Sequence, residues 1–155
     1  MKIFLSMSIL FIVLISGCNK ENDALTSPGE HFKPVSWLFN DVNNNVLLAI
    51  NDDKILPSWE GLSKDTLFNL PFNNTQFIKI VFLDNGNNIL IPPSDLGYQL
   101  GWEIEDTTKV TITGGSDKYS FNILSKNIGQ TRFQLFVLHA GQKDAMTPFI
   151  TIWIK

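Results

Sequence analysis

Apolar and polar residues alternate over short stretches through most of the chain, and turn-forming residues separate these stretches. Alternation with a period of two is typical of half-buried β-strands. Beyond residue 34 no segment has the apolar spacing of an amphipathic helix. The predicted strands are residues 35–39, 46–50, 76–83, 88–91, 99–105, 109–113, 118–124, 131–139 and 148–155.

The clearest hairpin is predicted where residues 76–83 run through Asn85-Gly86 and return as residues 88–91. Asn-Gly is a strong hairpin turn because both positions tolerate positive φ. Both alternating sets of side chains in 76–83 are apolar apart from Lys79, which predicts a central strand covered on both sides. Residues 52–72 are less regular, and one helical turn is the interpretation considered for residues 63–69.

Short strands at regular spacing predict an all-β fold, a single immunoglobulin-like β-sandwich of about seven to nine strands over residues 35–155. Residues 119–123, 127–131 and 133–138, followed by a last strand to Lys155, are similar to the ending of bacterial immunoglobulin-like domains. That resemblance implies the fold and no particular function. The predicted core residues are Phe121, Ile123, Phe133, Leu135, Val137, Ile150 and Ile152.

The first residues follow a different pattern. Lys2 precedes an apolar run over residues 3–15, shorter than the roughly 20 residues of a membrane-spanning helix. Ile15-Ser16-Gly17-Cys18 resembles the bacterial lipobox, with Ile15 at the position where Leu is commonest. The resemblance implies that residues 1–17 are a signal peptide that is removed and that Cys18 then carries diacylglycerol.

Residues 18–34 are polar and interrupted by Pro28-Gly29, which predicts a lipidated flexible tether. Lys20-Glu21 and Asp23 resemble the short acidic export signal of surface lipoproteins of Bacteroidota. The expected location is therefore the bacterial cell envelope, lipid-anchored at the outer membrane and facing either the periplasm or the surface.

Composition removes several classes of function. The chain has 12 basic and 15 acidic residues and no basic run, so nucleic-acid binding is not expected. Its single cysteine lies at the lipobox, so no disulfide forms within the chain. The many asparagines have two interpretations, which are turn-tolerant residues or an amide surface that faces a glycan.

The sequence offers little for catalysis. It has no Gly-x-Ser-x-Gly motif, and its two histidines are His31 in the tether and His139. Glu103 and Glu105 share a strand face about 7 Å apart, a separation that suits glycoside hydrolysis. Solvated residues alternating with buried Trp102 are the preferred interpretation, and neither an enzyme nor a cofactor is expected.

His139 and Asp144 form the one place where a metal-binding histidine lies close to a carboxylate. Gln142 stands where a second histidine would be needed, and Gln is a poor ligand for transition metals. The chain is therefore expected to fold without metal, and a weak metal-binding module at the His139/Asp144 loop is kept as an alternative.

The predicted function is a membrane-anchored envelope lipoprotein with a non-enzymatic immunoglobulin-like binding or structural module. Its partners are the membrane, through Cys18, and an envelope protein or glycan. Contacts are expected from residues 85–88, 92–98 and 140–147, and Trp59 is either a lid over the core or an exposed contact. Leu96 to Trp102 with Gly114-Gly115 distantly resembles the chagasin-like protease inhibitors, although His139-Ala140 stands where their Arg-Pro-Trp segment is needed.

Overall fold

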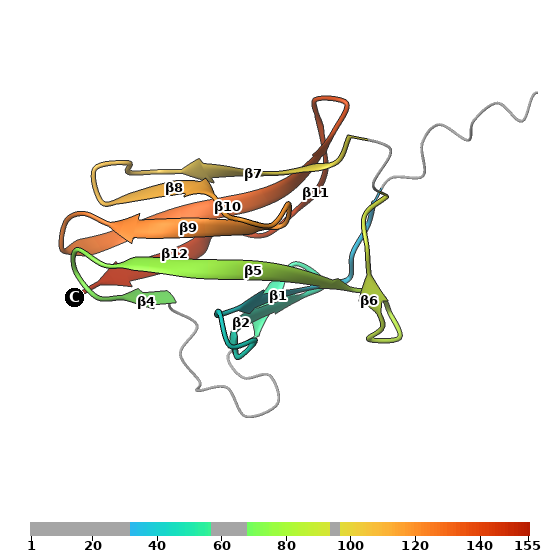
Figure 1. Ribbon diagram of the computed structural model, residues 1–155, viewed down its shortest axis with the longest axis horizontal. Helices are drawn as coiled ribbons and strands as arrows, with labels where there is room; N and C mark the ends of the chain where they lie inside the picture. Colours follow the sequence, from blue (N-terminus) through green and yellow to red (C-terminus); the bar gives the residue numbers. More distant parts are fainter. Residues whose placement is uncertain (1–31, 57–67, 94–96) are drawn as a thin grey trace, which may run out of the picture. The chain divides into compact units, whose positions relative to one another are not determined.

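A computed structural model describes residues 32–56, 68–93 and 97–155, which belong to one compact unit, His31–Lys155. These residues form strands, turns and bends without a helix, which confirms the all-β prediction (Figure 1). The strands are β1 Ser36–Asn40, β2 Val46–Asn51, β3 Lys54–Leu56, β4 Phe68–Leu70, β5 Thr75–Leu83, β6 Ile89–Leu90, β7 Gln99–Ile104, β8 Val110–Gly114, β9 Ser120–Ser125, β10 Gly129–His139, β11 Gln142–Met146 and β12 Ile150–Ile154.

The strand order within two sheets confirms the immunoglobulin-like sandwich. One sheet is ordered β3-β2-β1-β5-β9-β8, with β6 paired to β5, and the other β11-β10-β12-β4, with β7 paired to β10. If β1, β5, β7, β8, β9, β10 and β12 are lettered A to G in chain order, the sheets contain A-B-E-D and C-F-G. This is the arrangement of constant-type immunoglobulin domains.

The twelve described strands exceed the predicted seven to nine, and three of them lie where the sequence was interpreted differently. β3 and β4 lie in the irregular stretch of residues 52–72, and β4 makes Phe68 and Asn69, the end of the helical turn considered for residues 63–69, extended instead. The other residues of that turn lie outside the described residues. β4 pairs in parallel with β12 and ends before Pro71. β11 lies within residues 140–147, predicted as a loop, because this segment forms a hairpin with β10.

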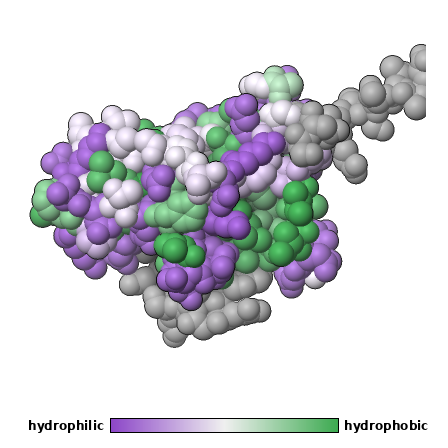
Figure 2. Space-filling model, viewed as in Figure 1, coloured by the Kyte–Doolittle hydropathy of each residue, from purple (hydrophilic) through white to green (hydrophobic). Residues whose placement is uncertain are grey.

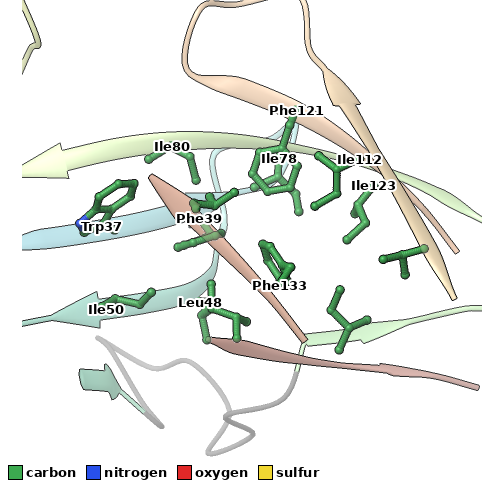
Figure 3. Packing of buried hydrophobic residues seen from close by; sticks show 14 of the residues in the cluster. Trp37, Phe39, Leu48, Ile50, Ile78, Ile80, Ile112, Phe121, Ile123 and Phe133 are labelled. Atoms are coloured by element: carbon green, nitrogen blue, oxygen red, sulfur yellow. The ribbon is translucent and has the colours of Figure 1, made fainter. Parts of the chain in front are cut away.

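All seven predicted core residues are fully buried between the sheets. The rings of Phe121 and Phe133 meet across the core at 6.2 Å between centroids. Figure 3 shows these two rings with Phe39, Ile78 and side chains from both sheets. Burial of these apolar side chains is the main contribution to the stability of such a domain.

β5 is central, as predicted, because β1 and β9 pair with its two edges. Only one of its faces is fully covered. Ile78, Ile80 and Phe82 point into the core, whereas Lys79 on the opposite face is exposed. The prediction of cover on both faces was therefore wrong at Lys79.

The packed part of the chain begins before the predicted boundary at residue 35. Phe32 is 5% exposed, and its ring lies 5.0 Å from that of Phe82. The end of the predicted tether thus belongs to the core. The predicted signal peptide, Cys18 and Trp59 lie outside the described residues. Within the described ranges, no helix has the length and apolar character needed to cross a membrane.

Two hairpin turns explain much of the asparagine content. Asp41 Oδ1 accepts hydrogen bonds from the backbone N–H groups of Asn43 and Asn45, each 2.8 Å long. Asp84 Oδ1 accepts the equivalent pair from Gly86 and Asn88 at 2.7 and 2.9 Å. Asn44 and Asn87 occupy the same position in the two turns, with φ of 62° and 61°. The turn-forming interpretation of these asparagines is therefore correct.

Candidate binding groove between β7 and β8

β7 shows why an alternating strand at the border of a sandwich leaves part of its apolar face uncovered. Leu100, Trp102 and Ile104 point toward the core and are partly buried. β7 pairs with β10 on one side only among the described strands. Because no strand lies beyond β7 in that part of the chain, inward side chains at this border are covered incompletely.

The outer face of β7 is fixed by contacts with β10 and β11. A side chain at Gly101 would collide with the ring of Phe136, which packs over this position. Lys143 Nζ lies 4.2 Å from the centroid of that ring and donates a hydrogen bond to Glu103. These contacts hold β7 in place at the border of its sheet.

The two carboxylates considered for catalysis are both held in ion pairs. Glu105 accepts two hydrogen bonds from Arg132, one of them 2.8 Å from Nε, and Glu103 bonds Lys143. The Arg132 guanidinium lowers the pKa of Glu105. A general acid of a glycosidase needs a raised pKa, so this arrangement favours the structural interpretation.

β8 forms the opposite wall and pairs with β9 only among the described strands. Val110 and Ile112 point inward, while the turn after Gly114 returns to β9. Gly115 packs directly against Ser120, whose hydroxyl donates to the Asp117 carbonyl at 2.8 Å. Space beside Gly114 is open. The β8 wall is therefore apolar at Val110 and Ile112, and at Gly114 and Gly115 it is polar and has no large side chains.

Two neighbouring cavities lie between these walls, with volumes of about 340 and 290 Å³. Trp102 lines both cavities, so they are neighbours, and the two together are named here the β7–β8 groove. Figure 1 shows β7 and β8 running side by side along one border. The lining residues are Leu100, Trp102, Ile104, Thr107, Val110, Thr111, Ile112, Gly114, Gly115, Ser116, Asp117, Lys118 and Ser120.

The backbone along this groove has hydrogen-bonding groups directed away from both sheets. The N–H of Glu105 donates to Arg132 and the N–H of Gly115 to Ser120, at 3.0 and 2.9 Å. In antiparallel pairs, alternate residues direct both backbone groups to the same side. Residues of the other parity therefore face the free edges. They are Leu100, Trp102, Ile104, Val110 and Ile112, all of which line the groove.

The structure brings the predicted pair His139 and Asp144 together across the β10–β11 hairpin. His139 Nδ1 lies 3.4 Å from Asp144 Oδ2, and the Asp144 side chain is 2% exposed. The ring of Tyr98 stacks on His139 at 4.3 Å between centroids. In the described part of the chain, no three His, Cys, Asp or Glu side chains are placed to share a metal ion. The geometry suits a structural contact between the His139 imidazole and the buried Asp144 carboxyl group.

The loops expected to gather at one end are connected there by aromatic rings. Phe32 contacts Phe82, which precedes the 84–88 turn, and also Tyr98 at 5.9 Å. Tyr98 in turn stacks on His139, where the β10–β11 turn begins. Residues 94–96 lie outside the described residues. The third loop is shorter than expected, because β11 reduces it to Ala140 and Gly141.

Sequence reasoning missed the groove because it treated Trp102 and Ile104 as ordinary core positions. The five residues between β7 and β8 look like a hairpin link, whereas the two strands belong to different sheets. The sequence carries a weak signal, since β8 ends at Gly114 and Gly115 follows it, two positions where bulky side chains would narrow the groove.

No protein-family model and no curated protein sequence matches the chain. Among solved structures, it is similar to domains 4 and 5 of the S-layer protein SbsC, with a TM-score of 0.41 and 12% identity. The match covers 76% of this chain and 75% of that chain. A likeness this distant indicates neither an activity nor a partner, and the strand order described above defines the fold.

Proposed function

We propose that the protein is a lipid-anchored binding module of the bacterial outer membrane, without catalysis, that holds an extended segment of a partner polypeptide in the β7–β8 groove. One observation carries the choice of partner. The residues whose backbone groups face the free edges also line the cavities. An extended peptide satisfies both features at once, because its backbone pairs with an edge while alternate side chains enter the groove.

The residues that line the groove indicate which peptide side chains it would accept. Trp102 and Ile104 at one end call for apolar side chains at alternate positions, since burying such surface is favourable by about 25 cal/mol per Å². The other end is lined by Gly114, Asp117 and Lys118 and suits a polar or charged residue. Variable-type immunoglobulin domains carry an additional strand next to strand C, the position of β7 here. The partner segment is proposed to take that place.

A photocrosslinking experiment in intact bacteria tests this proposal. Benzoylphenylalanine replaces Lys118, an exposed long side chain that lines the polar end of the groove, or Thr113, an exposed residue on the opposite face of β8. We expect a protein adduct from position 118 and none from position 113. The adduct should map to an extended segment with apolar residues at alternate positions.

Affinity for a synthetic peptide of the captured segment provides the matched control. Gly114→Trp fills the groove and should abolish binding, whereas Thr113→Trp adds the same bulk to the other face and should leave it unchanged. Equal crosslinked adducts from positions 118 and 113, or a glycan adduct alone, would refute the peptide groove. Capture of a papain-like protease that the protein inhibits would instead favour the inhibitor alternative.

Metabolic labelling with a palmitate analogue tests the lipid anchor independently. The lipobox predicts that the intact chain is labelled and sediments with membranes, and that Cys18→Ser loses both properties. Unchanged labelling in the Cys18→Ser variant would show that the anchor assignment is wrong.

A further inference from the structure

Ile89 in the short strand β6 and Ile91 directly after it are among the most exposed apolar side chains of the described residues. Ile89 is 70% and Ile91 78% exposed, while Leu90 between them packs against the core. Alternation along an extended segment therefore directs Ile89 and Ile91 away from the core. Figure 2 shows hydrophobic atoms gathered at the end of the domain where Figure 1 places β6. Ile89 and Ile91 are named here the β6 patch.

The β6 patch lies close to the point where the chain enters the packed domain. The backbone N–H of Val35 donates to the carbonyl of Leu83 at 2.9 Å, and Leu83 pairs with Ile89. Phe32 packs against Phe82, which pairs with Leu90. Neighbouring strands lie about 4.8 Å apart, so the patch is one strand away from the entry of the N-terminal segment.

We propose that the β6 patch rests on the lipid surface to which the chain is anchored. This inference depends on the proposed acylation of Cys18. The segment from Cys18 to Phe32 is short, and a flexible chain of about fourteen residues spans roughly 20 Å on average. The entry point and the adjacent patch therefore stay near the headgroups. Transfer of the two isoleucines out of water into the interface is favourable.

The neighbouring turn shows which kind of membrane contact to expect. Residues 84–88 contain no lysine or arginine, and the Asp84 carboxylate accepts hydrogen bonds from Gly86 and Asn88. The tip beside the patch is thus rich in neutral amides. Contact should be hydrophobic and should persist at high salt, because screening acts on charge pairs and leaves apolar burial intact.

The test uses the full-length acylated protein, reconstituted into vesicles of phosphatidylethanolamine and phosphatidylglycerol. Ile91→Cys carries an environment-sensitive fluorophore, and bromine atoms on the lipid acyl chains quench it on contact. Ile128→Cys is the matched control, because Ile128 is 65% exposed in the β9–β10 turn, far along the strands from β6. We expect loss of most of the fluorescence at position 91, unchanged at high salt, and little loss at position 128.

Dye stoichiometry separates failure of this inference from failure of the anchor. An acylated Cys18 has no free thiol, so each variant should bind one dye, whereas two dyes would show that acylation did not occur. With one dye bound, equal quenching at positions 91 and 128 would overturn the inference. Protection of position 91 in native membranes without quenching in the lipid vesicles would also overturn it and would assign the patch to a protein partner or a second copy.

Discussion

The two lateral borders of the sandwich differ in whether additional strands pair with their edges. At one border, β2 and β3 extend the sheet beyond β1, and β4 adds to β12. At the other border, β7 and β8 each have a single neighbour among the described strands and face cavities. The closed border is built from residues between the first and second strands of the immunoglobulin order. The chain thus supplies additional strands on one side and leaves the other side open to a strand from elsewhere.

The consequence appears in the burial of inward side chains. Leu48 and Ile50 on β2 are 2% and 1% exposed, because the strand has neighbours on both sides. Trp102 and Ile104 on β7 also point inward but are only partly buried. Their apolar surface at the open border remains available to a ligand. An additional neighbouring strand therefore determines whether an inward-pointing side chain is fully buried or keeps part of its apolar surface exposed.

The largest predicted effect compares one truncation at each border. Phe39→Ala removes a fully buried ring beside β2 and should lower the free energy of unfolding by about 3 to 5 kcal/mol. Trp102→Ala removes a larger but partly exposed ring and should lower it by only about 1 to 2 kcal/mol. Urea denaturation measures both changes.

Phe72→Ala is the control for this comparison, because Phe72 is 52% exposed and its loss should change stability little. If Trp102→Ala destabilises the domain as much as Phe39→Ala, the β7 border is an ordinary part of the core. The proposed groove would then lose its physical basis.

A smaller effect is predicted at His139, on the hairpin that continues the closed border. His139→Ala removes the imidazole beside the buried Asp144 carboxylate and the stack on Tyr98. Desolvation of a buried polar group that loses a partner costs about 1 to 3 kcal/mol. The melting temperature should therefore fall by several degrees, and it should fall in Asp144→Asn as well.

Chelation distinguishes the His139–Asp144 contact from the alternative metal site. The intact chain should melt at the same temperature with and without excess chelator, because the described residues offer His139 and Asp144 without a third ligand nearby. A fall on chelation that disappears in His139→Ala would support the weak metal-binding module.

Periodicity was sufficient to predict the central strands and their core. Phe121 and Phe133 alternate with polar neighbours, and burial of one face leaves only one register for each strand. The hairpin at Asp84 was also predictable, because Asn85-Gly86 is a local turn signal, but the positive φ lies at Asn87 and not at Asn85 or Gly86. In these elements local chemistry and tertiary packing favour the same structure.

The border strands were not predictable in this way. β3 and β4 have three residues each, too few to show a period. β3 pairs with β2, the strand directly before it, whereas β4 pairs with β12 from a distant part of the chain. Trp102 and Leu48 look alike in sequence, since each is an apolar residue in an alternating strand. They differ in the presence of a neighbouring strand, which depends on topology that a single sequence does not specify.

The smallest predicted effect concerns the Asp84 turn, and it appears as a change with pH. Hydrogen bonds from Asn88, first from its backbone N–H, lower the pKa of the Asp84 carboxyl below its usual value. A carboxyl whose folded pKa is lowered contributes stability above its unfolded pKa of about 4, and the contribution is lost as pH falls through the folded pKa.

Asp84→Asn keeps the shape of the side chain but removes its charge. It should therefore melt slightly below the intact chain at neutral pH, and the difference should shrink as the pH falls below about 4 and vanish below the folded pKa. Asp117→Asn, at another exposed turn, is the control for general surface charge. An equal shift in both variants, or a difference that persists in acid, would show that the Asp84 hydrogen bonds do not stabilise the turn.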